Sequence, residues 1–205
     1  AERGTGIERT AKFFFPQANP GGRRSSKYAR KLHKLRNCKI LTQYHTQETI
    51  QYQGRDVTFL VSEFVDGHLL SDFVATQVGG RLSAFEGLHL LHALTKGLEQ
   101  VHRLGEFHGD LDVDNVVVQR HGLGFEVKLL DLGEAPAGWP TGEMIREDVC
   151  DLIRIFYDVI GGARYYAKQP PEIKGIINGL KRSLIRDKFK NAGSLRRHLE
   201  NMHWY

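Results

Sequence analysis

Residues 108–115 read HGDLDVDN, and residues 130–133 read LDLG. Between the two segments lie two short runs rich in valine around a His-Gly turn, which predicts a hairpin of strands. Asp110 and Asn115 are therefore expected on the loop before this hairpin, and Asp131 at the end of its second strand. These three side chains would converge at one edge of the strands.

Side chains of this kind suit phosphate chemistry with a metal ion. Carboxylate and amide oxygens are the ligands that Mg²⁺ prefers, held through one or two protein carboxylates together with substrate phosphates. A remaining carboxylate could accept the proton of an attacking hydroxyl. The segment thus predicts a magnesium site with a carboxylate base beside it.

The composition around this segment is that of a folded protein. The chain has 205 residues, of which 40% are hydrophobic and 26% charged, which allows one domain or two small lobes. No run approaches the roughly 18 apolar residues of a membrane span. Cys38 and Cys150 lie far apart, which excludes a disulfide framework and a cysteine zinc site. Two free thiols and the missing signal pattern favour a cytoplasmic location, although a chain that starts at Ala1 is expected to be a fragment.

The first third of the chain is rich in strand signals. Strands are expected over residues 7–15, 40–52 and 57–61, with a helix in between that ends near Asn37. Residues 1–65 would form a small β-rich lobe.

Helical signals dominate residues 66–205, which would form a second, larger lobe. A capping box at Ser83 and Glu86 opens a helix with a leucine stripe that ends near Gly105. A second helix is expected from about residue 147 to 160. Two more are expected after Pro171, the last ending at residues 203–205.

A basic segment accounts for the net charge of +5. Eight Lys and Arg residues lie between Arg23 and Lys39, and no Asp or Glu occurs between Glu8 and Glu48. Two interpretations stay open. The segment is the solvated face of a helix, or it binds an anionic partner such as phosphate, nucleic acid or an anionic surface.

The two motifs resemble a pair known from kinases. H-G-D-x-x-x-x-N followed by D-L-G is similar to H-R-D-x-x-x-x-N followed by D-F-G in the protein-kinase-like superfamily. Gly109 is more typical of RIO-type, lipopolysaccharide-kinase-type and aminoglycoside or choline kinases. The resemblance implies an α+β, bilobal protein-kinase-like fold, with a reduced N-lobe (residues 1–65) and a helical C-lobe (residues 66–205).

The resemblance also implies roles in phosphoryl transfer from ATP. Asp110 would be the base for an acceptor hydroxyl, Asn115 and Asp131 would hold Mg²⁺, and Lys12 would orient the phosphates.

Supporting positions match the family pattern as well. Residues 60–67, LVSEFVDG, resemble the hinge, where the backbone of Glu63 and Val65 would meet the adenine and Ser62 would guard the pocket. His108 would pack as scaffold. Asp148 resembles the aspartate that braces the catalytic loop by accepting its backbone amides.

Three departures bear on function. No G-x-G-x-x-G loop precedes Lys12, either because the chain is truncated or because the protein never had one. The basic helix carries no glutamate to pair with Lys12, although Glu48 could substitute. Residues 134–147 contain no A-P-E element, so the peptide-docking platform of protein kinases is expected to be absent or minimal.

Three functional hypotheses follow. The first is an active kinase that uses ATP and Mg²⁺ and a hydroxyl acceptor, either protein Ser/Thr, a sugar, a lipid-linked sugar or a small amino alcohol. The second is a pseudokinase that binds nucleotide or a partner. The third is an interaction module that uses the Arg23 to Lys39 patch for nucleic acid or the ribosome.

Overall fold

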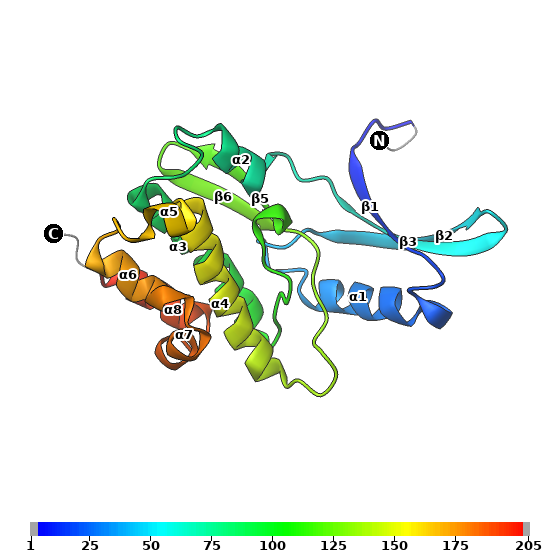
Figure 1. Ribbon diagram of the computed structural model, residues 1–205. Coiled ribbons are helices and arrows are strands. Elements are labelled where there is room, and N and C mark those ends of the chain that lie inside the picture. Colours follow the sequence, from blue (N-terminus) through cyan, green and yellow to red (C-terminus); the bar gives the residue numbers. More distant parts are fainter. Residues whose placement is uncertain (1–3, 203–205) are drawn as a thin grey trace. The chain divides into compact units, whose positions relative to one another are not determined.

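The computed structural model describes residues 4–202, which form two compact units that divide between Asp66 and Gly67 (Figure 1). The elements of the first unit are strands β1 (Arg9–Phe14), β2 (Tyr44–Tyr52) and β3 (Arg55–Glu63), the 3₁₀ turn η1 (Pro20–Gly22) and helix α1 (Arg23–Lys34).

The sheet of the first unit has β3 in the middle, in the order β1-β3-β2, with antiparallel pairing on both sides. Gln53 and Gly54 join β2 to β3 with φ values of 50° and 71°. Positive φ at both central residues defines the turn that matches the twist of a hairpin. Helix α1 packs against β2 and β3 and buries Leu32, and Leu60 of β3 is also buried.

Helix α1 begins where Asn19 supplies the missing hydrogen bonds. The buried Asn19 side chain accepts from the backbone amides of Arg24 (3.0 Å) and Ser25 (3.1 Å) through Oδ1. These are amides at the start of a helix that have no partner within it. Ser25 Oγ in turn accepts from Asn19 Nδ2 at 3.1 Å. The helix is thereby attached to the loop that follows β1.

The second unit consists mainly of helices, with a small sheet in the order β4-β5-β6. Its elements are β4 (His68–Leu69), α2 (Leu70–Thr76), α3 (Ala84–Arg103), η2 (Val113–Asn115), β5 (Val116–His121), β6 (Gly124–Leu129), α4 (Thr141–Val159), α5 (Gly162–Tyr166), α6 (Pro171–Ile177), η3 (Asn178–Leu180), α7 (Arg182–Lys188) and α8 (Ala192–Glu200).

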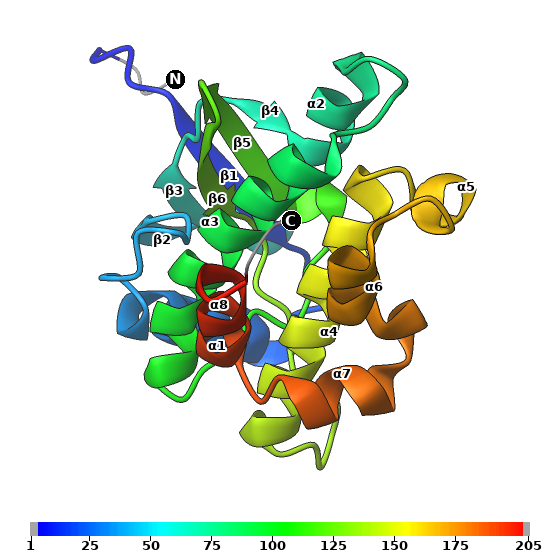
Figure 2. The same ribbon diagram turned by 90° about the vertical axis from the view of Figure 1, so that its left-hand side faces the viewer.

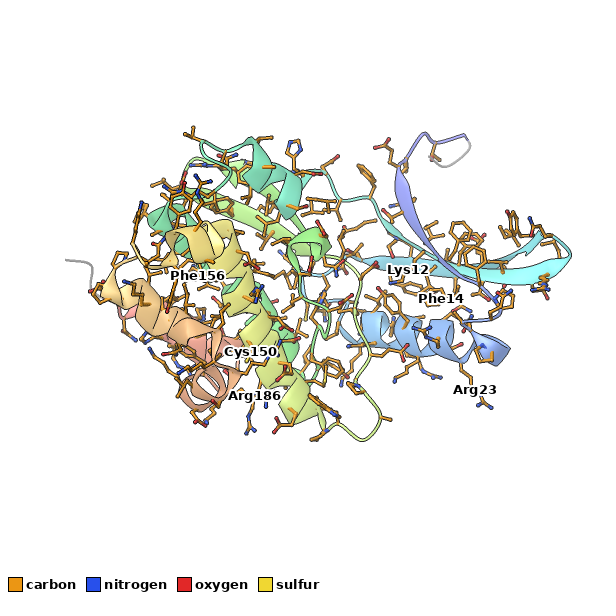
Figure 3. The ribbon with its side chains drawn as sticks, viewed as in Figure 1. Lys12, Phe14, Arg23, Cys150, Phe156 and Arg186 are labelled. Carbon is orange, nitrogen blue, oxygen red and sulfur yellow. The ribbon has the colours of Figure 1, made fainter. Side chains whose placement is uncertain are left out.

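Helices α3 and α4 form the centre of this unit and lie side by side in Figures 1 and 2. The predicted capping box is confirmed, because Ser83 Oγ accepts from the amide of Glu86 at 3.2 Å and Glu86 Oε2 accepts from the amide of Ser83 at 2.9 Å. Leu98 of α3 is buried in the core, and so is Phe156 of α4, which Figure 3 labels. Helix α8 packs against α3.

Two predictions about the helices were wrong, namely the start of α4 and the number of helices near the end of the chain. Helix α4 begins at Thr141, six residues before the expected start, because Pro140 is extended (ψ 149°) and its carbonyl accepts from the amides of Glu143 and Met144. After Pro170, the described residues form three α-helices, since Asn178 (φ 49°) ends α6 in the left-handed region. Helix α8 ends at Glu200, and the expected helical end at residues 203–205 lies outside the described part.

None of the helices in residues 4–202 has the length and apolar character that crossing a membrane requires.

Candidate active site

Asn115 makes two hydrogen bonds to Asp110 within the loop that joins α3 to β5. The Asn115 Nδ2 group donates to the backbone oxygen of Asp110 at 2.8 Å and to its Oδ2 at 3.2 Å. Between them, Asp112 Oδ1 accepts from the amide of Asp114 at 2.7 Å and starts the 3₁₀ turn η2. The Asp110 carboxylate is exposed, while its orientation is set by the amide of Asn115.

The DLG segment lies directly against the HGD segment. The amide of Leu130 donates to the backbone oxygen of Asn115 at 2.9 Å, and the amide of Gly133 donates to the backbone oxygen of His108 at 2.8 Å. The ring of His108 accepts from the amide of Asp110 through Nδ1 (3.3 Å), so Nε2 carries the proton and donates to the oxygen of Leu130 at 2.7 Å. His108 is fully buried, as the scaffold role predicts.

Asp131 lies between these bonded residues in a strained backbone conformation. Its φ is 47°, in the left-handed region that residues other than glycine rarely adopt. Its side chain is exposed. Such strain persists only where the surroundings over-determine the backbone and is common at functional sites. The bonds of its neighbours Leu130 and Gly133 to the HGD segment supply that constraint.

Two glycines allow the motifs to approach this closely. Gly109 has a φ of 84°, and a β-carbon there would lie 2.9 Å from ring atoms of Phe107. A β-carbon on Gly133 would lie 2.4 Å from the carbonyl oxygen of Gly109. The glycine that replaces the arginine of the H-R-D pattern is therefore a steric requirement of this loop.

Asp148 of α4 braces the loop between α3 and β5 through hydrogen bonds to its backbone amides. The carboxylate is fully buried and accepts from the amides of His108 (Oδ2, 2.7 Å) and Gly109 (Oδ1, 2.8 Å). The predicted bracing role of Asp148 is thus confirmed by its contacts. A buried carboxylate is tolerated only when its oxygens are bonded in this way.

His102 is a third partner of Asp148 that sequence reasoning missed. Its Nδ1 accepts from the amide of Ala192 at the start of α8 (3.1 Å), so Nε2 carries the proton and donates to Asp148 Oδ2 at 3.0 Å. The signal in the sequence is its position four residues after Leu98, which places a histidine on the apolar stripe of α3.

Asp151 lies one turn after Asp148 on α4, and the negative charges of the site change its pKa. Burial, followed by the charges of Asp148 and Asp110, raises the pKa of Asp151 to about 7. This occurs although the guanidinium of Arg182 lies 3.1 Å from Asp151 Oδ1. Among residues 4–202, no group of three or more His, Cys, Asp or Glu side chains gathers as a metal cluster.

The other predicted site residues belong to the first unit. Lys12 lies on β1 opposite Leu60, with Nζ 4.7 Å from the ring centroid of Tyr28 on α1. The amide of Glu63 donates to the oxygen of Gln43 at 2.9 Å, at the end of β3. Val65 follows two residues later and is half-buried.

Glu48 does not take the place of the glutamate that helix α1 lacks. In the ladder, Glu48 lies opposite Phe59 and Lys12 lies opposite Leu60. Side chains of consecutive residues point to opposite faces of a sheet, so Glu48 and Lys12 lie on different faces.

The architecture and these motifs define a domain of the protein-kinase-like class, and solved structures agree. A structure of Rad53 in complex with AMP-PNP matches 95% of this chain and 53% of that chain, with a TM-score of 0.67 and 18% identity. The kinase domain of PknI from Mycobacterium tuberculosis matches 97% of this chain and 85% of that chain, with a TM-score of 0.61 and 18% identity. The predicted α+β kinase-like fold is confirmed.

The family follows from the sequence. Residues 10–169 match the lipopolysaccharide kinase (Kdo/WaaP) family, so the chain belongs to this family of kinases.

Curated relatives are protein kinases by name. The serine/threonine-protein kinase pkn2 of Myxococcus xanthus is 36% identical over 117 residues, which are 57% of this chain and 13% of that protein. The probable serine/threonine-protein kinase PknB of Bifidobacterium longum is 26% identical over 146 residues, which are 69% of this chain and 19% of that protein. The chain thus spans a fifth or less of the length of these relatives.

Proposed function

We propose that the chain is a phosphotransferase that uses ATP and Mg²⁺ and transfers the γ-phosphate to a hydroxyl acceptor. The observation that carries the proposal is the double hold of Asn115 on Asp110, on a loop braced by the buried Asp148. In this reaction the acceptor oxygen bonds to the γ-phosphorus, and the bond to the β,γ-bridging oxygen breaks. ADP leaves, and the hydroxyl proton goes to a base.

Asp110 is the proposed base. Its carboxylate is exposed, so an acceptor can reach it, and one of its oxygens is already oriented by Asn115 Nδ2 at 3.2 Å. A carboxylate of fixed orientation can align the hydroxyl as well as accept its proton. This favours turnover over the alternative of a pseudokinase, in which the carboxylate would have no function to keep it in place.

Asn115 and Asp131 fit a magnesium ion by the chemistry of their oxygens. Because Asn115 donates to Asp110 twice through Nδ2, its Oδ1 is the end of the amide available as a ligand. Asp131 adds a carboxylate, and Mg²⁺ takes its other ligands from water and the nucleotide phosphates. A bound Mg²⁺ would neutralise the charge that develops on the phosphates.

The first unit supplies the proposed nucleotide contacts. Lys12 would orient the α- and β-phosphates. The amide of Glu63 donates to Gln43, so any adenine contact by Glu63 is made by its carbonyl, with the amide of Val65 as the second contact. Both are backbone contacts, which explains why these positions carry no demanding side-chain signature.

The acceptor is proposed as a hydroxyl of either of two classes. The family description points to a sugar of a lipopolysaccharide, whereas the names of the relatives point to protein serine or threonine. One carboxylate base serves both, so an assay with radiolabelled ATP should compare a phosphate-free lipopolysaccharide core with casein. Label in one acceptor selects that class.

Binding and transfer are tested together. ATP is titrated calorimetrically into the wild-type chain with and without Mg²⁺, and into Asp131→Ala and Asp110→Asn. We expect binding that depends on Mg²⁺ and is lost in Asp131→Ala. We expect Asp110→Asn to bind ATP normally and to lose transfer by a factor of about 10² or more. ATP binding by the wild type without transfer to any acceptor would instead support a pseudokinase that binds nucleotide. Absence of ATP binding would contradict the kinase and leave only a pseudokinase that binds a partner.

A second candidate function is binding of an anionic partner by α1, because four exposed cations lie in one row along the helix. Arg23, Lys27, Arg30 and Lys34 follow the i, i+4, i+7, i+11 spacing of one helix face, and Figure 3 shows Arg23 pointing away from the sheet. Helix α1 contains no Asp or Glu.

The test for this row is the salt dependence of binding to heparin and to vesicles with anionic lipid. Replacement of all four residues by Gln should abolish a binding that weakens steeply with salt. Binding that survives the replacement would show that the row is only a solvated helix face.

A further inference from the structure

The partner of Lys12 on α1 is an aromatic ring. In related kinases a glutamate on the facing helix orients the phosphate-binding lysine. Helix α1 packs on the sheet that carries Lys12, yet it contains six Lys and Arg residues and neither Asp nor Glu. The residue of this helix that meets the lysine is Tyr28, whose ring centroid lies 4.7 Å from Lys12 Nζ.

This contact is part of a packed arrangement on one face of β1. Lys12 and Phe14 are two residues apart and share a face of the strand, which Figure 3 shows on the side of α1. The ring of Phe14 lies 5.8 Å from that of Tyr28 at an angle of 59°. Tyr28 therefore contacts two side chains of β1, and Phe14 limits the positions that its ring can take.

The distance and the charges suit a cation–π interaction. An ammonium within about 6 Å of a tyrosine centroid is attracted by the negative face of the ring. The charged residues of α1 are all cations, among them Lys27 and Lys31, so the helix offers Lys12 no carboxylate. The ring is therefore the group of α1 that attracts the ammonium of Lys12.

We propose that Tyr28 takes the place of the acidic residue and is the positioning residue that holds Lys12 ready for the phosphates of ATP. The inference rests on the proposed function, because Lys12 is assigned to the nucleotide there. Tyr28 acts through Lys12 and need not touch ATP itself.

The experiment compares the binding of ATP with that of adenosine, which has no phosphates. In Tyr28→Leu we expect the Kd for Mg-ATP to rise about 3- to 20-fold, with the Kd for adenosine unchanged. Tyr28→Phe keeps the ring and should bind ATP like the wild type. Tyr52→Leu, at an exposed tyrosine on β2, is the matched control and should leave both constants unchanged. Tyr28→Met, which conserves volume, replaces the leucine variant if that variant unfolds.

A double-mutant cycle with Lys12→Met tests whether Tyr28 acts through the lysine. In the Lys12→Met background, Tyr28→Leu should cost no further ATP affinity; additive losses would overturn the proposal. Equal losses for ATP and adenosine would also overturn it, since they would show a structural role alone. Lost affinity in Lys12→Met with none in Tyr28→Leu would refute the role of Tyr28 and leave the proposed function intact. Failure of the wild type to bind ATP would refute the proposed function itself.

Discussion

Gly133 and Gly109 are in such close contact that a β-carbon on Gly133 would lie 2.4 Å from the carbonyl oxygen of Gly109 and 3.2 Å from the β-carbon of Asp110. The amide of Gly133 also donates to the oxygen of His108, so the two segments cannot separate without losing this bond. The HGD and DLG motifs can thus pack this closely only because Gly133 has no side chain.

Gly133→Ala should therefore displace one motif from the other. We expect a loss of about 1–3 kcal/mol in the free energy of unfolding, as for other overpacked sites. Phosphate transfer should fall more than stability, since the loop that carries Asp110 must move. Gly142→Ala, near the start of α4, is the control, because no atom lies within 4 Å of its β-carbon position. Urea unfolding of both variants checks the prediction, and equal stability of the two would contradict it.

The removal of Asp148 should be among the most damaging single changes in the second unit. Asp148→Ala leaves the amides of His108 and Gly109 and the buried ring of His102 without this acceptor. We expect a cost of about 3–5 kcal/mol. The control is Asp158→Ala on the same helix, which removes an exposed ion pair with Arg154 and should cost about 0.5 kcal/mol or less. Thermal melting distinguishes the two; similar melting temperatures would show that Asp148 does not brace the loop.

Much of the second unit could be predicted because its signals are local in the sequence. The capping box at Ser83 depends on residues three apart, and the motifs around Asp110 and Asp131 have fixed spacing. The start of α4 could not be predicted as well, because Pro140 has no capping side chain that marks the start of a helix. Its carbonyl in fact accepts from the first amides of the helix.

Contacts between distant residues were beyond sequence reasoning. The bond from Ala192 to His102 joins residues 90 positions apart, and neither residue belongs to a motif. The same holds for Tyr28: the basic helix shows the missing glutamate, but only the packing of α1 on β1 shows which ring meets Lys12. Sequence reasoning finds residues that belong to a motif of fixed spacing and misses those whose role comes from tertiary contact.

Both cysteines should be unreactive in the folded chain. Cys38 and Cys150 are buried with exposed fractions of 2% and 3%. Burial raises the pKa of both thiols, that of Cys150 to about 12 with a further contribution from the charge of Asp151. Because the thiolate is the reactive form, we expect Ellman's reagent to react slowly with the native chain and fast with both thiols in guanidinium. Fast reaction of either thiol in the native chain would show that its unit opens readily.

Asp151 should make the stability of the fold depend on pH. Burial and the charges of Asp148 and Asp110 raise its pKa to about 7, whereas an aspartate in the unfolded chain titrates at about 3.9. Between these values the folded state holds a proton on Asp151 that the unfolded state has released. The contribution of Asp151 to stability therefore falls as pH rises from about 4 to about 7 and is constant above that range.

Asp151→Asn removes this titration and keeps an oxygen that can accept from Arg182, whose guanidinium also pairs with Glu147. The variant should gain stability relative to the wild type as the pH rises from 4.5 to 7.5, because only the wild type must then bury a charge. Urea unfolding of both proteins at the two pH values measures the difference directly. A difference in unfolding free energy that is the same at both pH values would show that Asp151 ionises as readily in the folded chain as in the unfolded one. An advantage of the variant that shrinks with pH would show that Arg182 outweighs the two neighbouring carboxylates.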